Sequence, residues 1–456
     1  FICIAFVVNI CSILAANEDL ITELPGLSKP INFKQYSGYL DASKGRHYFY
    51  WFFEATKDPE NAPVVLWLTG GPGCSSLFAS LTENGPFYIN KDGKTVETRD
   101  HSWNTVANIL YLESPAGTGF SYDSNNNYTN NDETTSLDNY LSLESFFQKY
   151  PNLKKNEFYI TGESYAGVYI PMLAKQIYKH NSTINLKGLA IGNGALQDDM
   201  DDNFGQSPWD YALSHGLMTT DEYEKKVEAC CECKAGAVEH QCDFSTPANQ
   251  TKCSSVRAVR LTTPNPYNIY DNCYPDLSYQ QLFDTYYRPK FDRIDLKYPQ
   301  FSNKAEKAEC IKLGHSIYLN TDAVRKALHV REGTKQWSPC GGPYDRNTFT
   351  TQQQNARDLI NTYKIPKFIV YNGDFDTVCD FIGDQRFVTN LGFKTTGHYR
   401  HWTVDGKSDG VIGGFIQEYE KGLSFVVVRG AGHMVPEDKP EAGLQLFKSL
   451  LGLAKL

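Results

Sequence analysis

The segment 158–167, with the sequence FYITGESYAG, places the strongest constraint on how this chain can fold. An apolar run leads into small residues that flank one serine, Ser164, and a helix-like segment follows. A sharp turn from strand to helix lifts a serine hydroxyl above a sheet, and it closes only where the flanking side chains are small. Gly162 and Ala166 meet that need, although the usual pattern has glycine at both positions. The segment therefore predicts a nucleophile elbow.

An acid and a histidine follow later in the chain. The runs FIVYNGDFD and FVVVRGAGHMVP each pass from a strand-like stretch through glycine into a loop. They place Asp376 and then His433 after Ser164, which is the chain order of α/β-hydrolases. A serine hydroxyl needs a neighbouring base, here His433, and the acid orients the imidazole. Asp374 is the alternative acid; Asp376 is preferred because it stands further past the strand.

A glycine-rich loop adds a fourth element. The buried-strand pattern VVLWLT ends in GGPGCSS, and glycines there let a substrate approach the backbone closely. In α/β-hydrolases this loop and the residue after the nucleophile supply the two oxyanion-hole amides. We therefore expect the amides of Gly71 and Tyr165 to form that hole. The alternative, a phosphate-binding loop, is disfavoured because no Gly-Lys-Ser/Thr ending follows.

The order of strand-like and helix-like segments predicts an α/β fold. Strand-like runs near 47–54, 63–69, 108–113, 157–161 and 186–192 alternate with helical stretches at 136–147 and 168–179. That alternation is typical of a mixed sheet with helices on both faces. The cysteine- and tyrosine-rich segment 197–311 lacks strong strand patterns and is read as an inserted cap. The expected division is a signal-peptide remnant at 1–16, a hydrolase core at 17–196 and 312–456, and the cap between its two parts.

Several long motifs occur together: WLTGGPGCSS, LESPAGTGFSY, TGESYAGVYIP, NGDFD and GAGHMVP. They resemble the serine carboxypeptidase family, and within it the lysosomal cathepsin A (protective protein) branch. The likeness covers nearly the whole chain after about residue 20. It implies an exopeptidase that releases C-terminal amino acids at acidic pH through a Ser-His-Asp acyl-enzyme, with no cofactor and no metal. Its substrates are peptides with a free C-terminus.

The resemblance also implies a site for the substrate carboxylate. It maps onto the backbone of Gly70, the carboxyl groups of Glu163 and Glu83, and Thr69. A protonated glutamic acid can donate a hydrogen bond to a carboxylate, whereas an ionised one repels it. The family usually has asparagine where this chain has Thr69, so one hydroxyl donor replaces an amide with two N–H groups.

The cysteines and glycosylation motifs indicate an exported protein. The resemblance suggests the disulfides Cys74–Cys340, Cys273–Cys310, Cys230–Cys253 and Cys231–Cys242. A zinc site in the cysteine cluster is the disfavoured alternative. The candidate glycosylation sites are Asn127, Asn181 and Asn249. The basic segment 286–309 resembles one that is excised when the precursor matures in this branch.

The remaining features concern location and partners. The apolar stretch at 1–16 reads as part of a signal peptide and no other run is long enough to span a bilayer, so we expect a lysosomal or secreted protein. The net charge of −9 implies no nucleic-acid surface. The resemblance adds a homodimer and lysosomal glycosidases as candidate partners. Two alternative functions stay open: a protective protein that stabilises such enzymes, and a serine acyltransferase.

Overall fold

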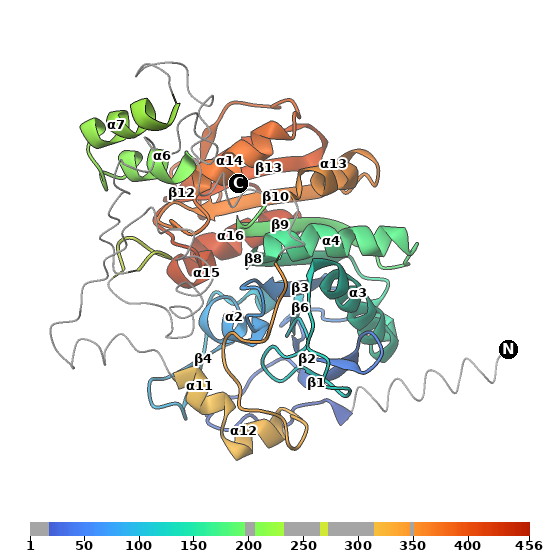
Figure 1. Cartoon of the computed structure of the whole chain (residues 1–456). Helices are drawn as coiled ribbons and strands as arrows, with labels where there is room; N and C mark the ends of the chain where they lie inside the picture. Colours follow the sequence, from blue (N-terminus) through green and yellow to red (C-terminus); the bar gives the residue numbers. More distant parts are fainter. Residues whose placement is uncertain (1–17, 197–205, 232–264, 272–313, 347–350) are drawn as a thin grey trace.

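A mixed β-sheet runs through the centre of the molecule (Figure 1). The structure is a computed structural model that describes residues 18–196, 206–231, 265–271, 314–346 and 351–456. The strand order in the sheet is β1-β2-β6-β3-β8-β9-β10-β13-β12-β11, and β7 pairs with β2. These strands are β1 (Gln35–Asp41), β2 (Arg46–Phe53), β3 (Val64–Thr69), β6 (Asn108–Leu112), β7 (Tyr122–Asp123), β8 (Phe158–Ser164), β9 (Leu186–Gly194), β10 (Lys367–Gly373), β11 (Arg400–Thr403), β12 (Ile412–Glu418) and β13 (Leu423–Val428).

Helices cover the sheet. The described helices are α2 (Ser76–Thr82), α3 (Asp132–Lys149), α4 (Ala166–Lys179), α6 (Ser207–Ser214), α7 (Thr220–Cys231), α11 (Gly314–Leu319), α12 (Asp322–Ala327), α13 (Gln353–Asn361), α14 (Phe381–Asn390), α15 (Val435–Asp438) and α16 (Pro440–Leu450). Helix α4 packs on β8 and β9, α14 on β10, and α2 on β3 and β6. A small hairpin of β4 (Phe87–Ile89) and β5 (Val96–Thr98) stands apart from the main sheet. No helix within the described ranges is long and apolar enough to cross a membrane.

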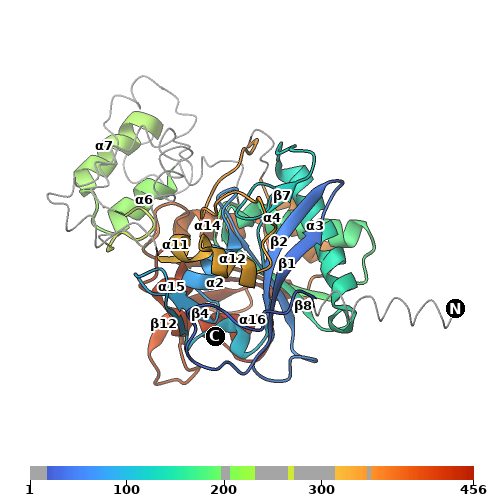
Figure 2. The ribbon, with the colours of Figure 1, turned by 90° about the horizontal axis from the view of Figure 1, so that it is seen from below.

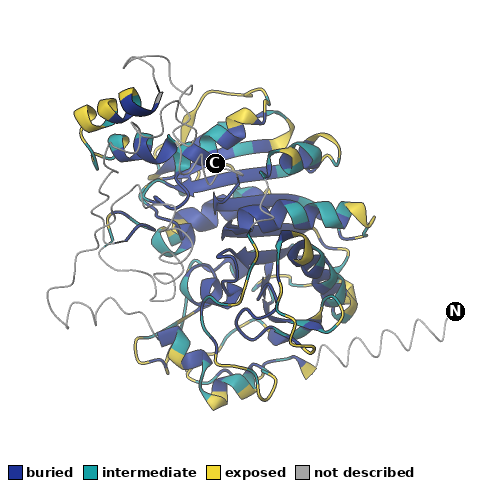
Figure 3. Ribbon diagram, viewed as in Figure 1, coloured by how far each residue is buried: buried dark blue, intermediate teal, exposed yellow. Residues whose placement is uncertain are grey.

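The central strands are buried on both faces. Every residue of β3 and of β8 is buried, and the middle of the sheet is dark blue in Figure 3. Successive side chains of a strand point to opposite faces, so complete burial requires cover on both sides. This explains why these strands read as continuous apolar runs in the sequence. The predicted α/β-hydrolase fold with a mixed sheet is confirmed by the strand order and by the helices that pack on the sheet.

The sheet brings distant parts of the chain to one edge. Strands β3, β8, β9, β10 and β13 are consecutive neighbours, and each pairs parallel to the next. Their carboxyl ends therefore lie side by side, and ligands of open α/β sheets bind at that edge. These strand ends and the loops that follow them carry Thr69 to Gly71, Ser164, Asp376 and His433.

Part of the expected insertion is visible. Helices α6 and α7 stand at one side of the core in both views (Figures 1 and 2). Helix α6 is fixed to the core where the Tyr211 hydroxyl donates to the carbonyl of Asp374 at 3.0 Å and Arg386 pairs with Asp210. Residues 197–205, 232–264 and 272–311 of the predicted cap, which include the segment 286–309, and the predicted signal remnant 1–16 lie outside the described residues. The domain boundaries stay a prediction.

Candidate active site

Ser164 occupies a strained turn between a strand and a helix. It ends β8, and α4 begins two residues later at Ala166. Its φ of 60° lies in the left-handed region, which a residue other than glycine seldom adopts and which is typical of a nucleophile elbow. A Cβ placed on Gly162 would lie 2.9 Å from the Cβ of Ala166 and 2.1 Å from the carbonyl oxygen of Leu68. The turn therefore requires glycine at position 162, while alanine fits at position 166.

A histidine and a carboxylate meet beside this turn. Asp376 and His433 are buried, and the Nδ1 of His433 lies 2.7 Å from Oδ2 of Asp376. Asp374, the alternative acid, instead accepts a hydrogen bond from the amide of Gly430 at 2.6 Å. Burial alone would lower the pKa of His433, but the charge of Asp376 and the hydrogen bond to it raise that pKa above its usual value. The pair therefore stabilises an imidazolium.

The other imidazole nitrogen is available for proton transfer. The Nε2 of His433 is buried and makes no hydrogen bond to any described residue. Because Nδ1 faces a carboxylate, the neutral ring carries its proton on Nδ1 and leaves a lone pair on Nε2. The charge of His433 acts on Glu163, the residue directly before Ser164, so the ring lies close to the elbow. This arrangement suits a general base for the Ser164 hydroxyl.

Several supports of this pair were missed by the sequence reasoning. The side-chain amide of Asn193, in β9, donates to Oδ2 of Asp376 at 2.9 Å. Backbone amides of Val378 and Cys379 donate to the same carboxylate at 2.9 and 3.1 Å. On the other side, the backbone amide of His433 donates to the carbonyl of Tyr267 at 2.7 Å. The sequence contained a signal for Asn193, because a polar residue between two glycines ends the strand next to the elbow. It contained no signal for Tyr267, which lies in the cap region.

The glycine-rich loop lies directly against the elbow. A Cβ on Gly70 would lie only 2.2 Å from the amide nitrogen of Tyr165 and 2.9 Å from the Cβ of Ser164. Gly71 has a φ of 107°, which glycine adopts readily. The structure thus places the loop and the start of α4 together at the serine. Two backbone amides near the same serine are the usual means of stabilising an oxyanion.

Two buried carboxyl groups lie beside the serine. Glu83 and Glu163 are each 1% exposed, and among the described residues no amide, hydroxyl or cationic donor reaches their carboxyl oxygens. The carboxyl groups interact with each other, and a hydrogen bond between them requires a shared proton. Burial raises the pKa of Glu163 to about 7; burial, and next the charge of Glu163, raise the pKa of Glu83 well above its usual range. The pair therefore holds a proton in mildly acidic solution.

Thr69 is the last residue of β3 and is buried beside the glycine-rich loop. The indole N–H of Trp67 donates to Oγ1 of Thr69 at 2.9 Å. Because an indole nitrogen only donates, the Thr69 oxygen is the acceptor and its own O–H is directed elsewhere. Thr69 also pairs across the sheet with Glu163, which places it next to the carboxyl pair.

Comparisons with known proteins identify the family of this chain. A family model described as serine carboxypeptidase matches residues 25–452. The chain belongs to the serine carboxypeptidase family. It is 38% identical to a lysosomal protective protein of Mus musculus, over 96% of this chain and 94% of that protein, and 36% identical to a serine carboxypeptidase of Caenorhabditis elegans, over 95% and 93%. The fold is similar to that of a prohormone-processing carboxypeptidase of Saccharomyces cerevisiae, with a TM-score of 0.72, 24% identity and 96% coverage of both chains.

Family membership fixes the reaction class. The protein is a serine-type exopeptidase that releases C-terminal amino acids from peptides. A group of residues suited to holding a metal ion is not found in the described part of this carboxypeptidase.

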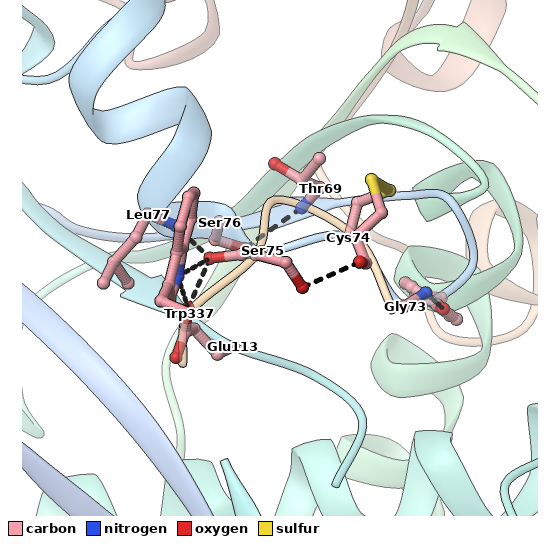
Figure 4. The surroundings of a disulfide bond; sticks show 11 residues. Thr69, Gly73, Cys74, Ser75, Ser76, Leu77, Glu113 and Trp337 are labelled. Carbon is pink, nitrogen blue, oxygen red and sulfur yellow. Dashed lines mark hydrogen bonds between the residues drawn. A yellow bond between two sulfur atoms is a disulfide. The ribbon is translucent and has the colours of Figure 1, made fainter. Parts of the chain in front are cut away.

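The predicted cysteines and asparagines are described in part. Cys74 and Cys340 form a disulfide, shown in Figure 4, and Cys230 is also disulfide-bonded. Cys379 is free and buried, and burial raises the pKa of its thiol, so it stays protonated. Asn127 and Asn181 are exposed. The side chains of Cys231, Cys242, Cys253, Cys273 and Cys310, as well as Asn249, lie outside the described residues.

Proposed function

We propose that this carboxypeptidase uses Ser164 as nucleophile, His433 as general base and Asp376 to orient the histidine. The observation that carries this proposal is the imidazole itself: Nδ1 lies 2.7 Å from a buried carboxylate, while Nε2 is buried without a partner among the described residues. Asn193 fixes the carboxylate from the other side, at 2.9 Å. A histidine held in this way can accept a proton at Nε2 and return it, which supports the proposed role.

The steps follow from these positions. Ser164 Oγ attacks the carbonyl carbon of the last peptide bond and its proton passes to Nε2 of His433. The amides of Gly71 and Tyr165 bind the negative oxygen of the tetrahedral intermediate. The imidazolium then protonates the leaving amine, so the C–N bond breaks and the C-terminal amino acid departs. Water attacks the acyl-enzyme with His433 again as base, and Ser164 regains its proton.

We assign recognition of the substrate carboxylate to Glu163, Glu83, Thr69 and Gly70. The two glutamic acids share a proton, and no other donor among the described residues reaches their carboxyl oxygens. The Thr69 oxygen accepts from Trp67, so its own O–H can donate to the substrate. A neutral pair attracts the carboxylate, whereas an ionised pair repels it. Since burial raises the pKa of Glu163 to about 7, recognition requires neutral or lower pH. Mildly acidic pH is therefore the proposed working range.

Labelling with a fluorophosphonate tests the nucleophile. The reagent is expected to modify Ser164 and to abolish release of the C-terminal residue from a blocked dipeptide. Ser164→Ala provides the control, and it should be neither labelled nor active while its melting temperature stays near that of the parent. Loss of activity through labelling of a different serine would contradict the assignment.

We further propose a lysosomal location and a protective role toward lysosomal glycosidases, with a homodimer as the working form. The support is the 38% identity to a protein named for both the lysosome and protection. Exposed Asn127 and Asn181 are in position to carry the glycans of an exported protein. Mixing the Ser164→Ala variant with a lysosomal β-galactosidase tests protection without proteolysis. A glycosidase half-life unchanged by the variant would contradict this role.

A further inference from the structure

Glu113 is a buried carboxylate that the reaction steps above do not use. It directly follows β6 and is completely buried. Its oxygens accept hydrogen bonds from the hydroxyl of Ser75, from the indole N–H of Trp337 at 2.7 Å and from the amide of Phe120 at 2.6 Å. Figure 4 shows Ser75 and Trp337 converging on it. Burying a charge is costly, so a carboxylate with this many donors calls for an explanation.

Two of these donors belong to the segments that the disulfide joins. Ser75 follows Cys74 directly, and Trp337 lies three residues before Cys340. The same segments are linked through their backbones, because the amide of Ser75 donates to the carbonyl of Pro339 at 2.7 Å. Ser75 also caps helix α2 by accepting from the amide of Leu77 at 3.1 Å. Glu113 thus fixes the far end of the loop that begins at Gly70.

The two ends of this loop are held by different means. At its start, Thr69 is a strand residue paired with Glu163, and Gly70 packs against the amide of Tyr165. At its end no strand follows, and the loop is held by Glu113, the disulfide, the start of α2 and the hydrogen bonds of Gly73 with the Tyr169 hydroxyl and the amide of Gly341. Gly71 lies between the two ends. Its amide is therefore the part of the site that should move if the far end is released.

The residue type at position 113 matters. Indole and backbone N–H groups only donate, so each carboxylate oxygen must accept. A glutamine would place its NH₂ group against one of these donors and lose that hydrogen bond. Burial raises the pKa of Glu113 to about 7, while the hydrogen bonds from Ser75, Phe120 and Trp337 lower it. These hydrogen bonds therefore offset part of the effect of burial.

We propose that Glu113 is a positioning residue for the oxyanion hole: through Ser75 and Trp337 it holds the Gly70–Ser75 loop so that the Gly71 amide faces the reacting carbonyl at Ser164. This inference rests on the proposed assignment of Gly71 and Ser164. It has a distinctive consequence. The carboxylate of the substrate is bound near the start of the loop, which the sheet fixes, so substrate binding is retained while transition-state stabilisation is lost.

The test is Glu113→Gln in the full chain, assayed on a blocked dipeptide and on an ester without a free carboxylate. We expect kcat to fall about 10- to 100-fold on both substrates, because removing one oxyanion donor costs about 100- to 1,000-fold and this change displaces a donor without deleting it. KM for the dipeptide should change by less than about twofold. Trp337→Phe should lower kcat in the same way, and the double variant should lose no more than the worse single variant, since both act through one contact.

Asp138→Asn is the matched control. Asp138 is also a buried carboxylate with several donors, among them Arg46 at 2.7 Å and the amide of Ser43 at 3.1 Å, but it lies in α3, away from the loop. The Asp138→Asn substitution should lower the melting temperature and leave kcat unchanged. Parent-like kcat in Glu113→Gln, a loss confined to KM, or an equal kcat loss in Asp138→Asn would overturn the proposal. If Glu113→Gln does not fold, Trp337→Phe decides by the same criteria. Fluorophosphonate labelling of the parent tests Ser164 separately, so failure of the proposed nucleophile is distinguishable.

Discussion

The proposed pairing of Glu163 and Glu83 predicts that pH should affect the hydrolysis of two substrates differently when one ends in a carboxylate and the other in an amide. A blocked dipeptide ends in a carboxylate, and its C-terminal amide is neutral. Hydrolysis of both requires neutral His433, so its titration cancels in the ratio of their kcat/KM values. Only the substrate with a free carboxylate is repelled when Glu163 or Glu83 is ionised. The ratio of acid to amide kcat/KM therefore reports the ionisation of this pair alone.

The size of the effect follows from the pKa and from Coulomb's law. Burial raises the pKa of Glu163 to about 7, so the ratio should be constant below about pH 6. Above about pH 7 it should fall about tenfold per pH unit as the neutral pair disappears. The fall has a limit. Two unit charges about 4 Å apart repel by about 4 kcal/mol at an effective dielectric constant of about 20, which corresponds to roughly 1,000-fold in binding.

The variant Glu163→Gln separates this explanation from others. Glutamine keeps a neutral hydrogen-bond donor at the same place and cannot ionise. The ratio for the variant should stay level to higher pH than in the parent, with the gain chiefly in KM. The assay is kcat/KM for both substrates, parent and variant, from about pH 4.5 to about pH 9. A parent ratio that does not change with pH, or a break at the same pH in Glu163→Gln, would refute the carboxyl-pair explanation and leave His433 in sole control.

Three further outcomes can be checked. Asn193→Ala removes the amide that donates to Asp376 at 2.9 Å, so kcat should fall about tenfold with KM unchanged; a parent-like kcat on an ester would show that the backbone amides suffice. Thr69→Val removes the hydroxyl that also accepts from Trp67, so KM for the acid substrate should rise about 5- to 20-fold while the amide substrate is unaffected; an equal rise for both would mean a folding effect. Burial raises the pKa of Asp380 to about 7 and that of Asp384 well above its usual range, so their folded forms bind protons more tightly than the unfolded chain. Stability from this source is complete below the unfolded pKa near 4 and is lost as pH rises through about 7, so the melting temperature should be several degrees higher at about pH 5 than at about pH 8, and an equal or higher value at about pH 8 would contradict it.

The sequence predicted the buried parallel strands in the middle of the sheet. Strands β3, β8 and β9 read as continuous apolar runs because both of their faces are covered, and the loops after them carry the predicted site. Strand β12 was missed because it begins Ile412-Gly413-Gly414, so its apolar pattern is short and broken by glycine.

The supports of the site escaped prediction for a different reason. Trp337 contacts Glu113 across 224 positions, and Tyr267 holds His433 from within the insertion. A local pattern encodes the turn that lifts a serine or ends a strand, because those events depend on neighbouring residues. A local pattern does not encode which carbonyl or indole from a distant part of the chain packs against the site.

This difference bears on how the site works. The proposed catalytic residues Ser164, Asp376 and His433 lie at or just after the carboxyl ends of β8, β10 and β13, which belong to one sheet, so the fold sets their spacing. The amide of Gly71 does not lie on a strand, and its place depends on a loop anchored through a buried carboxylate and a distant segment. The sheet thus places the proposed nucleophile and base, whereas the proposed oxyanion-hole amide of Gly71 depends in part on the side chain of Glu113. Substitutions around Glu113 should therefore alter the rate of acyl transfer while leaving the proton-transfer geometry between His433 and Asp376 intact.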